Sequence, residues 1–173
     1  MGAIITTIAL IVAGAVVVVA LGWAYRTAHR LDRLNVRVDL ARQSLLSSLD
    51  RRAVVARTIG AALRDGADNE MGETGRELII AADRAEAADE DVRETAENQL
   101  SSILGRIEVG ARPVALATEL ADAETRVMMA RRFYNDAVRD TRSLARRRLV
   151  RWLRLAGRAP IPRYFEIIER VTP

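Results

Sequence analysis

The chain has 173 residues, a length typical of one domain, and half of them are hydrophobic, 29% charged and 4% aromatic. All 27 basic residues are arginines, which with 23 acidic residues leave a formal net charge of +4. There is no cysteine and a single histidine, His29, so disulfides, thiolate metal sites, cysteine nucleophiles and any site needing two imidazoles are excluded.

The modest net charge is the result of cancellation between segments. Residues 1–25 carry no charged side chain, whereas residues 26–64 have a net charge of +6. The net charge is −9 over residues 65–99 and +7 over residues 100–173. The mean hydropathy of +0.01 therefore averages over an uncharged segment, two basic segments and one acidic segment.

The N-terminal segment, residues 1–25, is predicted to be a transmembrane helix. Its run Ile4–Leu21 is almost wholly Ile, Leu, Val, Ala and Gly, and at about 1.5 Å per residue it can cross a hydrocarbon core of about 30 Å. Trp23 and Tyr25 follow at the interface, with several arginines behind them. A cleavable signal peptide is the alternative, although a basic N-terminal region is missing and the apolar run is long. The positive-inside rule predicts an outside N-terminus and places residues 26–173 in the cytoplasm.

Residues 26–158 are predicted to form a helical domain, with residues 159–173 as a C-terminal tail. The first helix covers about 27–64, and at most one or two residues separate it from the span, so the two can be continuous. Its apolar residues recur at heptad-like spacing. They are Leu31, Leu34, Val38, Ala41, Leu45, Leu49, Ala53, Ala56 and Leu63. The glycines and acids of residues 65–75 predict a loop after it.

Two shorter helices are predicted next. Thr74 and Glu77 have the spacing of a capping box, which predicts a helix start at Thr74 and a helix reaching about Ala88. Asp89 is predicted to cap the following helix, because a carboxylate suits the positive end of the helix dipole. The apolar residues of that helix are Leu100, Ile103, Leu104 and Ile107.

A long fourth helix is predicted after Pro113, ending only at Gly157 and the prolines beyond it. Its apolar row has alternating spacings of four and three residues. The row consists of Leu116, Leu120, Ala123, Val127, Ala130, Tyr134, Ala137, Thr141 and Leu144. No stretch alternates like a strand, so the predicted class is all-α: a transmembrane helix followed by an elongated antiparallel four-helix bundle. In that topology the basic segments 26–64 and 139–158 share the end near the bilayer.

Several short motifs resemble those of one known family. On the first helix they are Arg37-Val38-Asp39 with Ala41, and Leu49 with Arg51-Arg52-Ala53; on the third, Ala96-Glu97-Asn98 with Leu100, Ser101, Leu104 and Arg106. On the last they are Glu124-Thr125-Arg126, Ala130-Arg131 and Phe133-Tyr134-Asn135-Asp136-Ala137-Val138-Arg139, followed by Arg163-Tyr164-Phe165-Glu166. Over roughly residues 30–168 the chain resembles the LemA family, with Arg126, Arg131, Tyr134 and Asn135 at motif positions.

The chain also departs from the LemA pattern. Thr141 and Arg142 stand where the family has a second Tyr-Asn pair, and Arg148 and Leu149 stand where it has Phe-Pro. The resemblance therefore implies a divergent member whose last helix is longer and more basic. It implies a membrane-anchored helical domain linked to envelope stress and membrane proteases, and it implies no catalytic residues.

The basic end of the last helix, residues 139–163, is the sharpest candidate site. Nine arginines with apolar neighbours stand there against one acid, Asp140. We interpret it as a segment that binds anionic lipid headgroups through arginine and packs tryptophan at the interface. The predicted lipid-contact residues are Arg146, Arg147, Arg148, Arg151, Trp152 and Arg154. A solvated basic face and a nucleic-acid-binding surface are the alternatives.

Three further features have simpler interpretations. The acids Asp83, Glu86, Glu90, Glu94 and Glu97 are spaced like one helical stripe, which we interpret as a solvated face because the histidine of bundle metal sites is missing. Tyr134 falls on the apolar row and is predicted to pack in the core. Asn135 is predicted to bond a neighbouring helix or to mark a partner contact.

Together these features predict a non-enzymatic scaffold or adaptor that self-associates at the cytoplasmic face of the cell membrane and contacts anionic lipid. No catalytic residue, cofactor or metal is expected. The expected partners are the phospholipid membrane and further copies of the chain, with a membrane protease or another envelope protein as a candidate. A small-molecule substrate is not expected. A hydrolase and a nucleic-acid-binding membrane protein are the alternatives.

Overall fold

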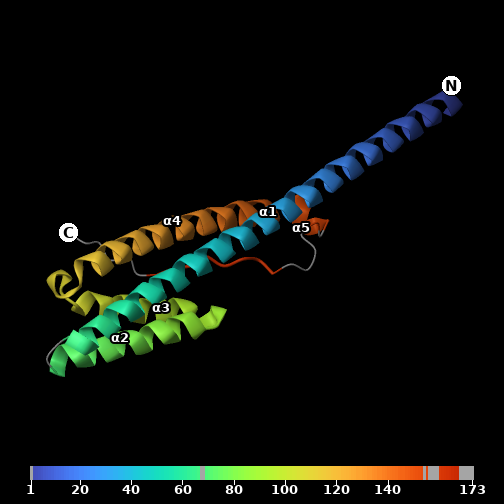
Figure 1. The fold of residues 1–173 in the computed structure, drawn as a ribbon. Helices are drawn as coiled ribbons and strands as arrows, with labels where there is room; N and C mark the ends of the chain where they lie inside the picture. Colours follow the sequence, from blue (N-terminus) through green and yellow to red (C-terminus); the bar gives the residue numbers. More distant parts are fainter. Residues whose placement is uncertain (1, 67–68, 154, 156–159, 168–173) are drawn as a thin grey trace. The chain divides into compact units, whose positions relative to one another are not determined.

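A computed structural model describes residues 2–66, 69–153, 155 and 160–167, and these are helical or irregular with no strand among them. The elements in chain order are α1 (Gly2–Gly66), α2 (Asn69–Ala87), α3 (Glu90–Arg106), the 3-10 turn η1 (Val109–Ala111), α4 (Val114–Ala145) and α5 (Arg148–Trp152) (Figure 1). The chain divides into two compact units. The first unit is Met1–Asp39 with Ala137–Arg163, and the second unit is Leu40–Asp136 with Tyr164–Pro173.

The uncharged N-terminal segment is the beginning of α1. An 18-residue window of this helix reaches a mean hydropathy of 2.9, and none of that window is buried. By length and composition it can cross a membrane, as the sequence predicts. The helix continues to Gly66 without a break after Tyr25, which confirms that the apolar segment and the first amphipathic helix can be one continuous element.

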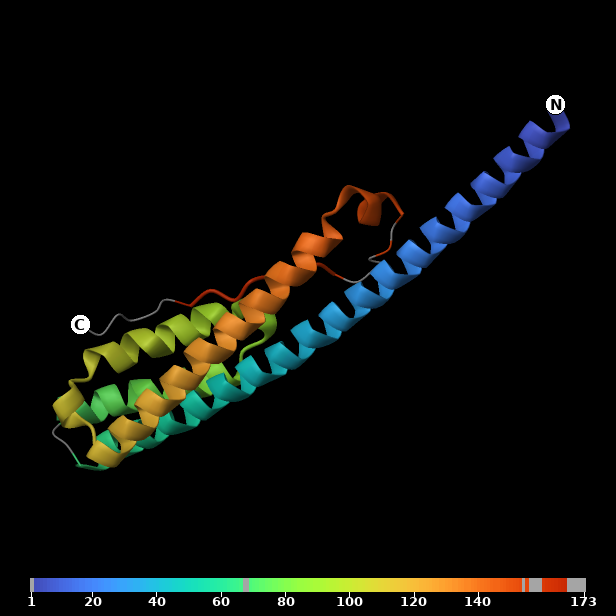
Figure 2. The same cartoon turned by 90° about the horizontal axis from the view of Figure 1, so that it is seen from above.

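Within the second unit, parts of α1, α2, α3 and α4 lie side by side (Figure 2). All four contribute side chains to one core. Its buried members are Ala53, Val55, Ala56, Ile59 and Leu63 of α1; Leu78, Ala81, Ala82 and Ala85 of α2; Leu100, Ile103 and Leu104 of α3 with Ile107 behind it; and Leu120 of α4. The apolar rows expected on the first and last helices are buried or half-buried along their whole lengths. The heptad-like spacing therefore identified the packed faces correctly.

The start of α2 differs from the prediction. The helix begins at Asn69, so the capping box at Thr74 is wrong and the expected loop 65–75 is too long. Gly72 and Gly75, interpreted as loop residues, lie inside α2 instead, and Gly75 meets α1 there. A Cβ on Gly75 would lie 2.6 Å from the carbonyl oxygen of Gly60, and a Cβ on Gly60 would lie 2.7 Å from the carbonyl oxygen of Gly75. The missing side chains let the two backbones touch.

α3 starts where the sequence predicts, and it ends at Arg106, so that Ile107 lies just beyond it. Asp89 occupies the N-cap with extended backbone angles, although its side chain makes no capping hydrogen bond. At the other end, Arg112 donates hydrogen bonds to the carbonyl oxygens of Leu104 (2.5 Å) and Ile107 (2.9 Å). Carbonyls at a helix C-terminus lack partners within the helix, so this guanidinium supplies the cap from the next segment.

The end of α4 corrects the prediction of one unbroken basic helix. α4 stops at Ala145 and a separate short helix, α5, follows after an extended Arg147. A continued helix would place three arginines in line with Leu144, at the spacings that share a helix face. These are Arg147, Arg148 and Arg151. The break instead brings Val150 into contact with Leu144, so that an aliphatic side chain is buried there.

Candidate functional site

The segment of the first unit that follows α4 carries the predicted lipid-contact residues. Val150 is fully buried and packs with Leu31 of α1 and Leu144 of α4. On the remaining surface of the segment, Leu149, Trp152 and Leu153 are 57%, 81% and 43% exposed. The positions i, i+3 and i+4 share one face of a helix. One buried side chain therefore holds α5 on α1, while three apolar side chains face outward.

The arginines of this segment surround that apolar face. Arg146, Arg147, Arg148 and Arg151 are all exposed, and no acidic side chain in the described part of the chain forms an ion pair with them. The two stretches that make up the first unit contain thirteen arginines and three aspartates. Arg154, the remaining predicted contact, lies outside the described residues. The four described arginines are thus available to a negatively charged surface.

Asn135 holds the returning C-terminal segment within the second unit. Its side-chain amide donates a hydrogen bond to the carbonyl oxygen of Phe165 (3.0 Å) and accepts one from the Phe165 amide (2.9 Å). One residue further on, the amide of Glu166 donates to the Glu94 carboxylate (2.9 Å). Asn135 therefore bonds the backbone of the irregular segment 160–167 and not a neighbouring helix, while its alternative role as a partner contact stays a prediction. The contact joins two of the motifs that carry the family resemblance.

Replacing Asn135 with alanine should release this C-terminal segment. Both hydrogen bonds to Phe165 are lost, and a surface amide without a partner exchanges its proton faster. We expect the Phe165 amide to exchange at least about tenfold faster, as each net hydrogen bond contributes about 1 kcal/mol. Hydrogen exchange followed by NMR measures this, with the Leu120 amide inside α4 as the reference. An unchanged Phe165 rate would contradict the assigned role.

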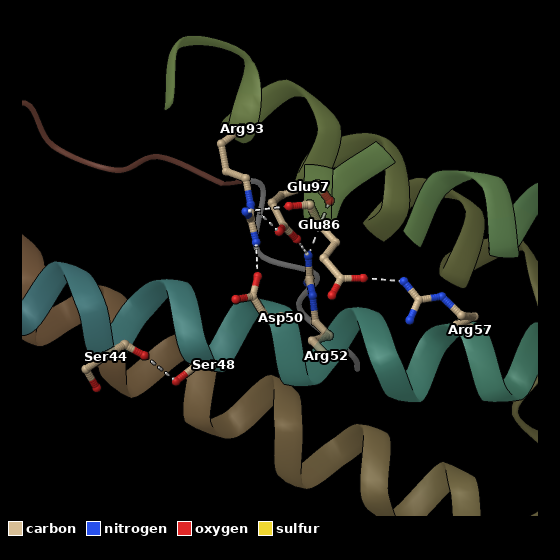
Figure 3. A network of polar contacts seen from close by, with 8 residues as sticks. All are labelled: Ser44, Ser48, Asp50, Arg52, Arg57, Glu86, Arg93 and Glu97. Carbon is tan, nitrogen blue, oxygen red and sulfur yellow. Dashed lines mark hydrogen bonds and ion pairs between the residues drawn. The ribbon is translucent and has the colours of Figure 1, made fainter. Parts of the chain in front are cut away.

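A buried ionic network joins α1 to α3 in the second unit (Figure 3). Arg52, Arg93 and Glu97 are 4%, 6% and 0% exposed. Arg52 pairs with one carboxylate oxygen of Glu97, and Arg93 donates to the other at 3.1 Å. Arg93 also pairs with Asp50 at 2.6 Å, and Arg52 donates to the hydroxyl of Ser101 at 3.1 Å. Two buried guanidinium groups thus share the Glu97 carboxylate, and Asp50 supplies the second negative charge. These ion pairs fix how the two helices pair.

The acidic stripe divides into two parts that the sequence did not separate. Glu97 is buried in this network, so its assignment to a solvated face is wrong. Asp83 and Glu86 remain outside and both pair with Arg57 of α1, while Glu90 pairs with an α1 arginine further toward the N-terminus. The hydrogen bonds that Arg57 donates to Glu86, and then to Asp83, raise the pKa of Arg57 above its ordinary value. The stripe therefore pairs α2 and α3 with α1.

The other motif residues are dispersed along α4. Tyr134 is buried, as predicted, and Arg131 is half-buried. Arg126 is exposed and lines an open polar groove of about 500 Å³ together with Ser47, Arg51 and Asp122. The structure does not gather these residues into one site. In the part of the chain that is described, no group of three or more His, Asp or Glu side chains is placed to hold a metal ion.

One surface feature that the sequence reasoning missed lies on α4. Met128, Met129 and Phe133 are 49%, 56% and 63% exposed. The spacing of Met129 and Phe133 could have identified it, because apolar residues four apart share a helix face and these two lie outside the core row.

In comparisons with known proteins, no family model, no curated protein and no solved structure matches this chain.

Proposed function

We propose that this protein is a single-pass membrane scaffold or adaptor without enzymatic activity, and that it self-associates at the cytoplasmic face of the cell membrane. The observation that carries the proposal is that α1 combines an exposed, uncharged segment with the core positions of the second unit in one helix. The anchor and the first helix of the domain are therefore the same element. The arginines that follow the span favour an outside N-terminus.

Self-association is supported by the exposed apolar face of α4. Met129 and Phe133 together present flexible and aromatic surface, which is typical of protein contacts. An anchored chain is also confined to a plane, and confinement raises the effective concentration of one copy for another. A second copy is therefore the partner we assign to this face. A membrane protease or other envelope protein is the further partner that we propose for the scaffold.

Phe133→Glu should dissociate the self-associated protein. A charge at the centre of an apolar contact has to be desolvated on association, and we expect apparent affinity to fall by about a hundredfold, corresponding to the 2–4 kcal/mol of a typical hot-spot residue. Size-exclusion chromatography with light scattering in a mild detergent measures the mass. Val114→Glu is the matched control, because Val114 is 84% exposed on the same helix. A wild-type protein that is strictly monomeric would refute self-association.

We also propose that the helical domain is an antiparallel four-helix bundle. The contribution of α1, α2, α3 and α4 to one core supports an antiparallel four-helix bundle of the kind that the LemA resemblance implies. Membership of that family, with its link to envelope stress, is likewise our proposal. Anionic lipid is the non-protein partner that we propose.

A further inference from the structure

We infer that the end of the first unit, formed by α5 and Leu153, is a binding site for the anionic phospholipids of the bilayer that α1 crosses. The inference names the lipid partner within the proposed function and rests on it for the anchor. It depends on four observations within the first unit: where α5 is held, what it exposes, how it is charged, and where tryptophan occurs.

The first observation is the position of α5 along α1. Val150 shares one small buried cluster with Leu144 and Leu31, and Leu31 lies ten residues beyond Leu21 and six beyond Tyr25. At about 1.5 Å per residue, Leu31 is about 15 Å past the apolar run and about 9 Å past Tyr25 along the helix axis. The polar headgroup region adds about 5–8 Å to each side of the hydrocarbon core. α5 is therefore held just outside the headgroups, within reach of side chains the length of arginine and tryptophan.

The second observation is an apolar face without a partner in the described part of the chain. Trp152 is 81% exposed beside Leu149 and Leu153, although Val150 in the same short helix is fully buried. The segment thus has one face toward the protein and one apolar face away from it. An exposed apolar patch rimmed by charges marks a site of protein or membrane contact, and a basic rim with tryptophan is typical of interfacial segments.

The third observation, charge, favours a membrane contact over a protein contact. The arginines beside this face, Arg146, Arg147, Arg148 and Arg151, are exposed, and the first unit as a whole carries ten more basic than acidic side chains. The second unit carries six more acidic than basic side chains. Positive charge is thus concentrated in the unit that contains the span, where a negatively charged leaflet attracts it.

Tryptophan follows the same distribution. The chain has two tryptophans, Trp23 and Trp152, and both belong to the first unit. Trp23 lies at the end of the apolar run, where interfacial tryptophans are enriched. Trp152 is separated from it by more than a hundred residues in sequence, yet α5 packs on α1 two turns beyond Trp23. We assign Trp152 to the interface, with the arginines bonding lipid phosphates.

The test uses the full chain with Trp23→Phe, which leaves Trp152 as the single tryptophan. The protein is reconstituted into lipid nanodiscs of phosphatidylcholine alone or mixed with phosphatidylglycerol, and acrylamide quenching of Trp152 fluorescence is measured. We expect the quenching constant to fall by about threefold or more in the anionic lipid, and the difference to shrink at high salt. Equal quenching in both lipids would overturn the inference.

Two sets of substitutions in the same background test the role of charge. The first set combines Arg146→Gln, Arg148→Gln and Arg151→Gln. In this variant the quenching constant of Trp152 should no longer depend on anionic lipid. The matched control, Arg84→Gln, Arg126→Gln and Arg132→Gln, removes three exposed arginines of the second unit and should preserve this dependence. If the control set abolished the dependence equally, the effect would come from overall charge and the α5 site would be rejected.

Two further arms separate this inference from its competitors. In the first, an oligonucleotide is added to the protein in neutral nanodiscs. If the oligonucleotide shields Trp152 from quenching and anionic lipid does not, the segment binds nucleic acid and the inference is overturned. Phe133→Glu should leave the protection by anionic lipid intact, because self-association is proposed to use α4. Loss of that protection would mean that Trp152 is buried between copies, which also overturns the lipid site while leaving self-association supported.

Discussion

Replacing Glu97 with alanine is expected to lower the free energy of unfolding by about 3–5 kcal/mol, since it leaves buried charges without a counter-ion. The Glu97 carboxylate is fully buried and is shared by Arg52 and Arg93, whose side chains are 5% and 7% exposed. Asp50 is 46% exposed and can balance only Arg93. Chemical denaturation in detergent, followed by circular dichroism, measures the loss.

Two comparisons isolate the reason for that loss. Glu77→Ala removes an exposed partner of Arg106 and should cost no more than about 1 kcal/mol. Replacing Arg52 and Arg93 with methionine and Glu97 with leucine removes all three buried charges, and stability should recover most of what Glu97→Ala loses. If Glu97→Ala cost no more than Glu77→Ala, the network would not be holding α1 to α3.

Gly75→Ala is expected to destabilise the protein by about 1–3 kcal/mol, the usual cost of forcing extra atoms into a packed contact. The new Cβ would lie 2.6 Å from the Gly60 carbonyl oxygen and 2.9 Å from the Arg64 backbone nitrogen. Both are backbone atoms of α1, so the conflict can be relieved only by moving one helix away from the other. Thermal unfolding of the full chain in detergent measures the change.

Gly72→Ala in the same helix provides the control with the opposite sign. A Cβ there comes no closer than 3.8 Å to any neighbour, the Arg64 carbonyl oxygen. Alanine in an open helical position stabilises by about 0.8–1 kcal/mol relative to glycine. The two substitutions should therefore shift the midpoint in opposite directions. A stabilising Gly75→Ala would show that α1 and α2 do not approach as closely as these distances require.

The amino-acid sequence by itself determines the helical class, the apolar N-terminal helix and the buried faces of the two longest helices. The run Ile4–Leu21 predicts a helix that can cross a membrane because a hydrocarbon core leaves few other choices for an uncharged apolar segment. The helical class and the buried rows of α1 and α4 followed from apolar spacing, since only one face of each helix can be covered. These properties depend on which residue types follow one another over short stretches of the chain, and the sequence shows this directly.

The tertiary structure decided the points at which a residue's role depends on a distant neighbour. Gly75 lies in a glycine-rich and acidic stretch that is typical of a loop. Only the nearness of Gly60 explains why Gly75 belongs inside α2. Glu97 continues an acidic stripe, and only Arg52, 45 residues away, explains its burial. The break before α5 allows Val150, rather than an arginine, to pack on Leu31. Each outcome avoids a steric conflict or an unpaired buried charge between segments far apart in sequence, so no local pattern could have predicted it.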